Sequence, residues 1–391
     1  MAVKPSGYGE NTLVNGIALN NPDFGGVIMV SVDFGEPDYA ESLHELRQLV
    51  ASAGMTVRAT LEGRRSSPDA KFFIGTGKAD ELKLLMEETQ TSLIAFNHDL
   101  SPSQQRNLER HLQAKVLDRT GLILDIFAQR AQSHEGKLQV ELAQLEHLST
   151  RLVRGWTHLE RQKGGIGVRG GPGETQLEID RRLLRLRVKQ LREKLIKLKQ
   201  QRDMQRRARK RSNLMTVSLV GYTNAGKSTL FNRLTQSGVY AADQLFATLD
   251  TTSRKVYMPE ANPIVLSDTV GFIKHLPTTL IEAFGATLEE AALADLLLHV
   301  VDISSTNREA QISQVNMVLA EIGALNVPQI VVLNQIDKLA LAPDITRDEQ
   351  GNINKVSLSA ASGEGLDLLK LALADQQQLL KRQSTEQSAY V

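Results

Sequence analysis

The chain has 391 residues and a net charge of +1, and its length is typical of roughly two or three domains. Hydrophobic residues make up 41% of it, which excludes a disordered chain and is enough for ordinary cores. It has no cysteine, which excludes disulfides, thiol catalysis and nearly every structural zinc site. No apolar run approaches the ~18 residues of a membrane span, and the N-terminus has no signal-peptide core, so we expect a cytoplasmic protein.

The near-neutral net charge conceals a basic segment at residues 181–212. This segment holds fifteen lysines and arginines against two acidic residues, Glu193 and Asp203. Such a run indicates either a solvated helix face or a contact with a polyanion. Because only 4% of the residues are aromatic, any contact with nucleic acid is expected to be made to phosphates rather than by base stacking.

Residues 1–25 are rich in Gly, Asn and Pro and lack periodicity, so we interpret them as a loose leader. Between residues 26 and 121 apolar runs alternate with amphipathic stretches, which predicts a small α/β domain with a mainly parallel sheet. Strands are expected at Val27–Val32, Met55–Ala59, Ser92–Phe96 and Lys115–Leu117, and helices at Tyr39–Ala53, Lys78–Glu88 and Pro102–Gln113. Ser101 and Gln104 form a capping-box pattern at the start of the last helix.

From residue 122 to 213 the hydrophobic period changes to four-three spacing. The repeating residues are Leu138, Leu142, Leu145, Leu152, Trp156 and Leu159, and then Leu184, Val188, Leu191, Leu195 and Leu198. This pattern predicts two helices of about 28 residues each in an antiparallel, coiled-coil hairpin. Residues 163–175, with six glycines, connect them. A helical hairpin needs only about two to five connecting residues, so we expect this glycine-rich tip to contact a partner.

Residues 214–375 alternate strands and helices again and have the size of one nucleotide-binding α/β domain, and residues 376–391 are predicted to be a polar tail. The strand pattern Thr216–Val220 leads into a GxxxxGK[ST] motif, and a helix is expected at Thr229–Leu234. The motif reads Gly221-Tyr222-Thr223-Asn224-Ala225-Gly226-Lys227-Ser228. Its backbone N–H groups are expected to cradle phosphates, with Lys227 at the β/γ phosphates and Ser228 on Mg²⁺.

Three further motifs follow predicted strands. They are the DxxG motif Asp268-Thr269-Val270-Gly271, then Asn334-Gln335-Ile336-Asp337, and then Ser359-Ala360-Ala361. Asp268 can hold Mg²⁺ through water, and Gly271 can offer its N–H to a γ-phosphate. Asp337 can accept from N1 and N2 of guanine, which adenine cannot supply, Asn334 can meet N7 and O6, and the backbone of 359–361 can meet O6. Together with the P-loop they predict a site for GTP and GDP.

The segment Phe246-Ala247-Thr248-Leu249-Asp250, with Asp268–Ile273, resembles the HflX family of ribosome-associated GTPases, in the Obg–HflX branch of the translation-factor-related GTPases. The similarity extends to residues 72–78, 118–130, 135–145 and 164–182. The resemblance implies that residues 246–250 bind the nucleotide as switch I and that Thr248 joins Ser228 on Mg²⁺. It also implies that Lys227, Thr248, Gly271 and Asn224 serve GTP hydrolysis.

The resemblance further implies a monomer that binds the 50S ribosomal subunit and its 23S rRNA through the basic arm and the glycine-rich tip. The family is linked to splitting stalled or idle ribosomes under stress, and to association with ribosomes and peripherally with membrane. Two alternatives stay open on the residues alone. One is a GTPase of rRNA assembly or tRNA metabolism, and the other is an RNA-binding module switched by nucleotide.

Several positions depart from the commonest GTPase pattern. Gln335 replaces the usual lysine of the NKxD motif, which is expected to weaken nucleotide affinity more than guanine preference. Phe272 follows the DxxG motif and cannot orient water as a glutamine would. Asn224 matches the asparagine that coordinates K⁺ in cation-dependent relatives, although an asparagine there can also merely close a turn. In the first domain, Gly75-Thr76-Gly77-Lys78 is too short for a P-loop.

Overall fold

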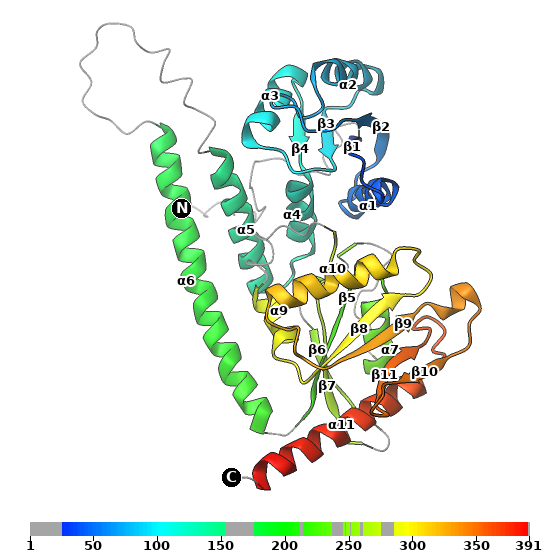
Figure 1. The fold of residues 1–391 in the computed structure, drawn as a ribbon. Coiled ribbons are helices and arrows are strands. Elements are labelled where there is room, and N and C mark those ends of the chain that lie inside the picture. The colour runs from blue at the N-terminus through cyan, green and yellow to red at the C-terminus, as the bar shows by residue number, and fades with distance from the viewer. Residues whose placement is uncertain are drawn as a thin grey trace, which may run out of the picture.

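The computed structural model consists of an N-terminal domain, a helical arm and a C-terminal domain (Figure 1). The structure describes residues 26–152, 176–211, 214–236, 245–246, 248–250, 252–258, 261–274 and 285–389. The predicted leader, the glycine-rich tip, Trp156, Leu159 and Ala247 lie outside the described residues. Within the described ranges, no helix combines the length and the apolar character needed to cross a membrane.

The N-terminal domain confirms the predicted small α/β fold. Its elements are β1 (Val27–Asp33), α1 (Tyr39–Ser52), β2 (Val57–Arg64), α2 (Thr76–Thr89), β3 (Leu93–Phe96), α3 (Pro102–Leu112), β4 (Lys115–Leu117) and α4 (Arg119–Arg130). The four strands are parallel in the order β2-β1-β3-β4. The capping box of α3 forms as predicted, with Ser101 Oγ accepting from the N–H of Gln104 and Gln104 Oε1 accepting from the N–H of Ser101.

The boundary between this domain and the arm differs from the sequence expectation. Residues 122–130 were expected to begin the arm, but they form most of α4, which packs against the N-terminal domain. Leu122, Ile123, Ile126 and Phe127 are buried with residues of β1 and α1. Helices that pack on a domain and helices that form an arm have the same spacing of apolar residues, so the sequence pattern did not reveal this boundary. In the structure the turn between α4 and α5 marks it.

The arm consists of α5 (His134–Leu152) and α6 (Gln176–Arg211), which lie side by side in opposite directions (Figure 1). Leu138, Leu142 and Leu191 are buried between the two helices, as the four-three spacing predicts. Ion pairs also link the helices: Arg187–Glu141, Arg192–Glu146 and Arg202–Glu135. The helices differ in length, with 36 residues in α6 against 19 in the described part of α5.

The C-terminal domain contains a seven-stranded sheet in the order β10-β11-β9-β8-β5-β7-β6. The strands are β5 (Thr216–Gly221), β6 (Thr252–Val256), β7 (Ile264–Asp268), β8 (Leu296–Asp302), β9 (Gln329–Asn334), β10 (Asp344–Arg347) and β11 (Ile353–Ser357). Among the described strands, only the edge strands β6 and β10 pair antiparallel with their neighbours. The helices are α7 (Lys227–Thr235), α9 (Gly285–Ala292), α10 (Arg308–Glu321), the 3₁₀ turn η3 (Ile336–Leu339) and α11 (Leu366–Ala389).

Residues 376–389 are helical, which corrects the expected polar tail. Helix α11 continues through them because its packing face does not end at residue 375. Leu369 and Leu373 are buried, Leu380 packs on the same cluster, and Gln377 donates from Nε2 to the Asn262 carbonyl at 2.7 Å. Most residues of this segment are polar, so its hydrophobic pattern does not predict the packing face that Leu380 and Gln377 continue.

One cluster of buried side chains runs from the N-terminal domain into the C-terminal domain. It joins α1 and α4 to Phe246, Leu249 and Val270, which belong to the predicted nucleotide motifs, and to Phe272, which follows one of them. On the opposite face of the large sheet, α7 and α11 cover a second core. The N-terminal domain therefore packs directly against the segments expected to contact the nucleotide.

Candidate nucleotide-binding site

The P-loop connects β5 to α7 through a turn that requires glycine. Gly226 has φ +91°, and a Cβ on it would lie 2.2 Å from Asn334 Nδ2. The absence of a side chain lets Asn334 donate from Nδ2 to the Ala225 carbonyl at 2.9 Å. Helix α7 then begins at Lys227, so its free N–H groups face the loop as in phosphate-binding sites.

Lys227 lies under the loop with its side chain buried. Its Nζ donates to the carbonyls of Gly221 and Tyr222 at 3.1 and 2.7 Å. Burial lowers the pKa of Lys227 to about 8, although the nearby Asp268 carboxylate opposes this shift. The ammonium group is thus desolvated, which strengthens its attraction to an anion.

The side chains of Ser228, Thr248 and Asp268 meet beside the P-loop. The hydroxyl oxygens of Ser228 and Thr248 lie 2.7 Å apart, and they donate to Asp268 Oδ2 at 2.8 and 2.9 Å. Burial raises the pKa of Asp268, and its Oδ1 is buried without a hydrogen-bond partner among the described residues. Two hydroxyls beside a carboxylate with a spare acceptor fit Mg²⁺, which prefers oxygen ligands.

The DxxG segment is hydrogen-bonded to the P-loop. The N–H of Phe272 donates to the Gly221 carbonyl at 3.1 Å, and the N–H of Thr223 donates to the Phe272 carbonyl at 2.7 Å. Thr269 donates to the Leu219 carbonyl at 2.6 Å, and Val270 is buried. The Phe272 ring is buried too, so this position presents no polar group to a reacting water.

The base-side motifs meet beside the P-loop. Asn334 accepts from the N–H of Ala360 at 2.9 Å through Oδ1, so both polar atoms of its amide hold protein loops, whereas we expected it to meet the base directly. Gln335 donates from Nε2 to the Asn224 carbonyl at 3.1 Å, while Asp337 is exposed at the start of η3. Ile336 and Ser359 are buried beneath this surface, and Arg233 donates to the carbonyls of Ala360 and Ala361.

The other described residues of the switch I motif have partners in the N-terminal domain and beside the arm. Phe246 is buried against Phe127 of α4 with ring centroids 4.6 Å apart, and Leu249 is buried in the same cluster. Asp250 accepts from the N–H groups of Gln132 and Ser133 at 2.9 and 2.7 Å. The resemblance implied that all three contact the nucleotide, but the structure places them against the N-terminal domain and the arm.

A buried network also reaches the P-loop from the N-terminal domain, and sequence reasoning missed it. Tyr222 donates to Glu45 Oε1 at 2.7 Å and accepts from the N–H of Lys274 at 2.8 Å. Arg119 donates to Glu45 Oε2 at 2.7 Å and to the Lys274 carbonyl at 3.2 Å. Burial and the adjacent Glu45 raise the pKa of Tyr222. No local pattern marks these residues, because Glu45 and Tyr222 are 177 positions apart.

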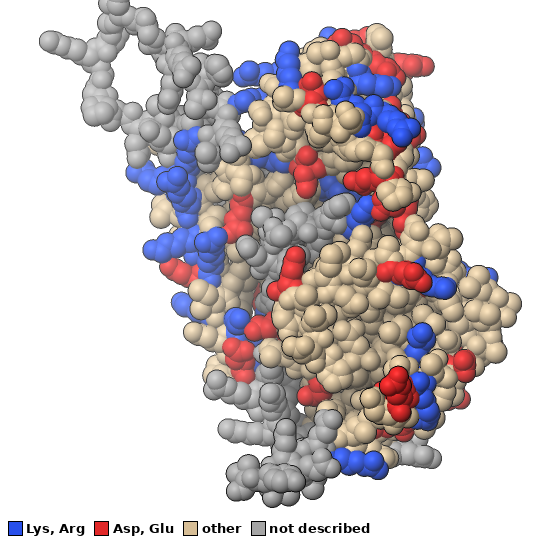
Figure 2. Space-filling model, viewed as in Figure 1, with Lys and Arg blue, Asp and Glu red and all other residues tan. Residues whose placement is uncertain are grey.

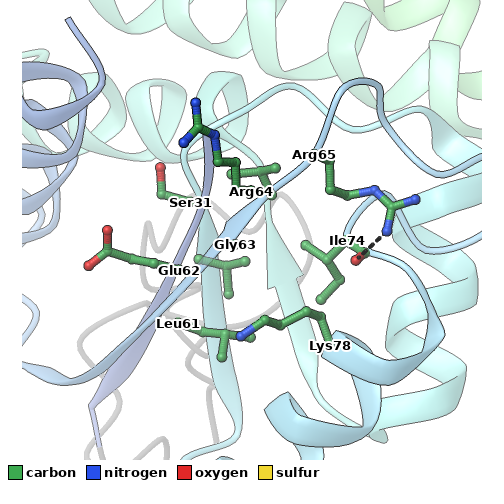
Figure 3. Close-up of a pocket in the computed structure, with 10 residues that line it drawn as sticks. Ser31, Leu61, Glu62, Gly63, Arg64, Arg65, Ile74 and Lys78 are labelled. Atoms are coloured by element: carbon green, nitrogen blue, oxygen red, sulfur yellow. Dashed lines mark hydrogen bonds between the residues drawn. The ribbon is translucent and has the colours of Figure 1, made fainter. Parts of the chain in front are cut away.

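A separate pocket lies in the N-terminal domain at the carboxyl-terminal end of β2 (Figure 3). Its cavity volume is about 70 Å³, and Arg64, Arg65 and Lys78 contribute to its lining. Arg65 donates to the Ile74 carbonyl at 3.3 Å rather than pointing freely into the cavity. The pocket is far smaller than the roughly 300–1,000 Å³ of typical ligand pockets.

Similarity to known proteins extends over most of the chain. Residues 40–128 match the family described as GTP-binding GTPase N-terminal, residues 130–209 match GTP-binding GTPase Middle Region, and residues 216–335 match 50S ribosome-binding GTPase. GTPase HflX of Escherichia coli is 54% identical over 89% of this chain and 82% of its own, and GTPase HflX of Magnetococcus marinus is 51% identical over 84% and 76%.

Among solved structures, the crystal structure of SsGBP in complex with GDP covers 91% of this chain and 99% of its own. It has 26% sequence identity and a TM-score of 0.52. The similarity therefore includes all three parts of the chain rather than the C-terminal domain alone. These findings agree with the convergence of the four motifs around one P-loop: the chain belongs to the HflX family and is a P-loop GTP hydrolase.

Proposed function

We propose that the protein binds the 50S ribosomal subunit and uses GTP binding and hydrolysis to split stalled or idle ribosomes under stress. The match of residues 216–335 to 50S ribosome-binding GTPases supports ribosome binding. The observation that carries the proposal is the basic face of the arm, because the other arm helix, α5, begins next to Asp250, two residues after Thr248. Exposed Arg185, Lys189, Lys194 and Lys197 belong to this face, and Figure 2 shows lysines and arginines gathered along α6.

The same proposal assigns roles around the guanine nucleotide. Lys227 and the N–H groups of the P-loop bind the phosphates, and Ser228 and Thr248 hold Mg²⁺. Gly271 contacts the γ-phosphate through its N–H. When bound, Mg²⁺ would supply positive charge at the phosphate oxygens. Asp268 Oδ1, buried and without a partner among the described residues, supports an acceptor role beside the metal. Exposed Asp337 is the residue for guanine recognition, and the two loops on either side of it are held together by Asn334.

The ribosome test uses purified 70S particles and the full-length protein with a non-hydrolysable GTP analogue. We expect 70S particles to separate into subunits, with the protein sedimenting with 50S. Shortening the loop 164–173 should leave GTP binding intact and abolish splitting. Binding to 50S without splitting would favour a role in subunit assembly, and sedimentation with neither subunit would contradict ribosome binding. A loop-shortened protein that splits 70S normally would contradict the role of the tip.

Hydrolysis by the isolated protein should be slow, because Phe272 cannot hold the attacking water. We propose that 50S subunits and a K⁺ ion at Asn224 supply the missing stabilisation. Asn224 lies in the P-loop with φ +62° and its side chain exposed, which is compatible with a ligand of a monovalent cation. We expect faster GTP hydrolysis in K⁺ than in Na⁺ at equal ionic strength, and Asn224→Ala should remove the difference while GDP still binds. Equal wild-type rates in both salts would exclude the cation role.

A further inference from the structure

Asp250 lies two residues after Thr248, and its carboxylate contacts Gln132 and Ser133, the residues just before α5, which we call the root of the arm. Oδ2 accepts from the N–H groups of Gln132 and Ser133 at 2.9 and 2.7 Å, and Oδ1 accepts from Ser133 Oγ at 2.5 Å. Ser133 Oγ in turn accepts from the N–H of Gly136 at 2.8 Å. A carboxylate at the beginning of a helix satisfies free N–H groups and is stabilised by the helix dipole. Asp250 therefore ties switch I to the root of α5.

Gly136 makes this contact possible. A Cβ on Gly136 would lie 2.1 Å from Asp250 Oδ1 and 3.2 Å from Asp250 Cγ. Any other residue at position 136 would have to push the carboxylate off its three donors. Glycine destabilises a helix relative to alanine, so its presence in the first turn of α5 is explained by the approach of Asp250 and not by helix formation.

The switch I segment that contains Thr248 is also held at its N-terminal end. The N–H of Leu245 donates to Ser52 Oγ of α1 at 3.0 Å, and Phe246 packs edge to face on Phe127 of α4. Thr248 lies between these two anchors with its hydroxyl at Ser228 and Asp268. The position of Thr248 is therefore set by contacts with the N-terminal domain on one side and with the root of the arm on the other.

From this arrangement we infer that Asp250 is a positioning residue that couples the root of the arm to Thr248. It does not act on the nucleotide itself. A shift of the α5 root withdraws the donors of Asp250 and releases Thr248 from the magnesium position. Coupling of this kind is reciprocal, so binding of the γ-phosphate also favours one position of the arm root. The inference rests on the magnesium role of Thr248 that is part of the proposed function.

The test compares Gly136→Ala with a matched control, Gly77→Ala in α2, whose Cβ would meet no atom of the described residues within 4 Å. The full-length variants are titrated with fluorescent GDP and with a fluorescent non-hydrolysable GTP analogue at limiting Mg²⁺. We expect Gly136→Ala to lower the affinity for the analogue by about tenfold, the equivalent of about 1.4 kcal/mol, with little change in the affinity for GDP. The difference arises because switch loops are ordered by the γ-phosphate and Mg²⁺. Gly77→Ala should change neither affinity.

A second pair of variants separates this coupling from a packing effect. Asp250→Ala should lower the affinity for the analogue more than the affinity for GDP. The double variant with Gly136→Ala should bind the analogue no more weakly than Asp250→Ala alone, because both substitutions remove the same interaction. Additive effects, equal weakening of GDP and the analogue, or a Gly136→Ala protein that binds like Gly77→Ala would overturn the inference. If Gly136→Ala lowers the unfolding temperature, Asp250→Asn decides by the same selectivity. Thr248→Ala in the same titration tests the magnesium role separately. If it does not weaken binding of the analogue selectively, the proposed role of Thr248 fails; if it does and Gly136→Ala does not, only the coupling fails.

Discussion

At the residue scale, Asn334 and Asp337 occupy different environments, and we propose different roles for them in guanine recognition. Asn334 uses both polar atoms of its side chain to hold the P-loop and the 359–361 loop, whereas Asp337 is exposed and is the residue that we propose contacts the base. We predict that Asp337→Asn changes the nucleotide preference from GDP to XDP, because the amide of Asn can donate a hydrogen bond where the carboxylate of Asp only accepts. Affinities for both nucleotides measure this, and an Asp337→Asn protein that keeps its preference for GDP would refute the assignment. Gln335→Lys is the matched control and should strengthen GDP binding moderately without changing selectivity.

At the element scale, the burial of Asp125 in α4 predicts that stability depends on pH. Asp125 lines a pocket between α4 and α5 together with Lys115, Asp118 and His147, and burial raises its pKa from 3.8 to about 6. The folded state thus binds the proton more tightly than the unfolded state, so stability falls as the pH rises from about 3.8 to 6. We predict that Asp125→Asn raises the free energy of unfolding at pH 7.5 by about 2 kcal/mol, allowing for partial exposure. Urea unfolding at several pH values should show that this gain in the free energy of unfolding disappears near pH 4. Glu87→Gln, at an exposed position, is the control and should have no effect. A gain that does not depend on pH would indicate a packing effect.

At the scale of the whole molecule, the basic segment of α6 should govern the electrostatics of RNA binding. Because phosphate contacts release counterions, affinity for rRNA is expected to fall steeply with salt. Replacing Arg206, Arg207, Arg209, Lys210 and Arg211 with alanine should reduce the slope of log affinity against log salt by up to about 0.9 for each phosphate that the variant no longer neutralises. Replacing the same number of exposed acidic residues of the N-terminal domain is the control and should not reduce the slope. An unchanged slope in the arginine and lysine variant would show that RNA is bound elsewhere.

The arrangement of the whole molecule also connects these scales. The N-terminal domain contacts the P-loop through Glu45 and Tyr222, and it contacts switch I through Phe127 and Phe246. The arm contacts switch I through Asp250. All three parts therefore meet at the segments that are expected to respond to the γ-phosphate, which is the arrangement required for a partner on the arm to affect nucleotide binding.

Local sequence patterns were sufficient to predict the elements whose chemistry is local. The P-loop, the DxxG segment and the capping box of α3 depend on glycines and short-range hydrogen bonds, so their residues predict both structure and role. The parallel sheet of the N-terminal domain and the paired helices of the arm followed from hydrophobic period. Distant contacts were needed to assign α4 to the N-terminal domain, to extend α11 to residue 389, and to place Phe246, Leu249 and Asp250 against the N-terminal domain and the root of the arm. These outcomes depend on partners distant in sequence, as in the contact of Asp250 with Ser133, 117 positions away, and no local pattern specifies such a partner.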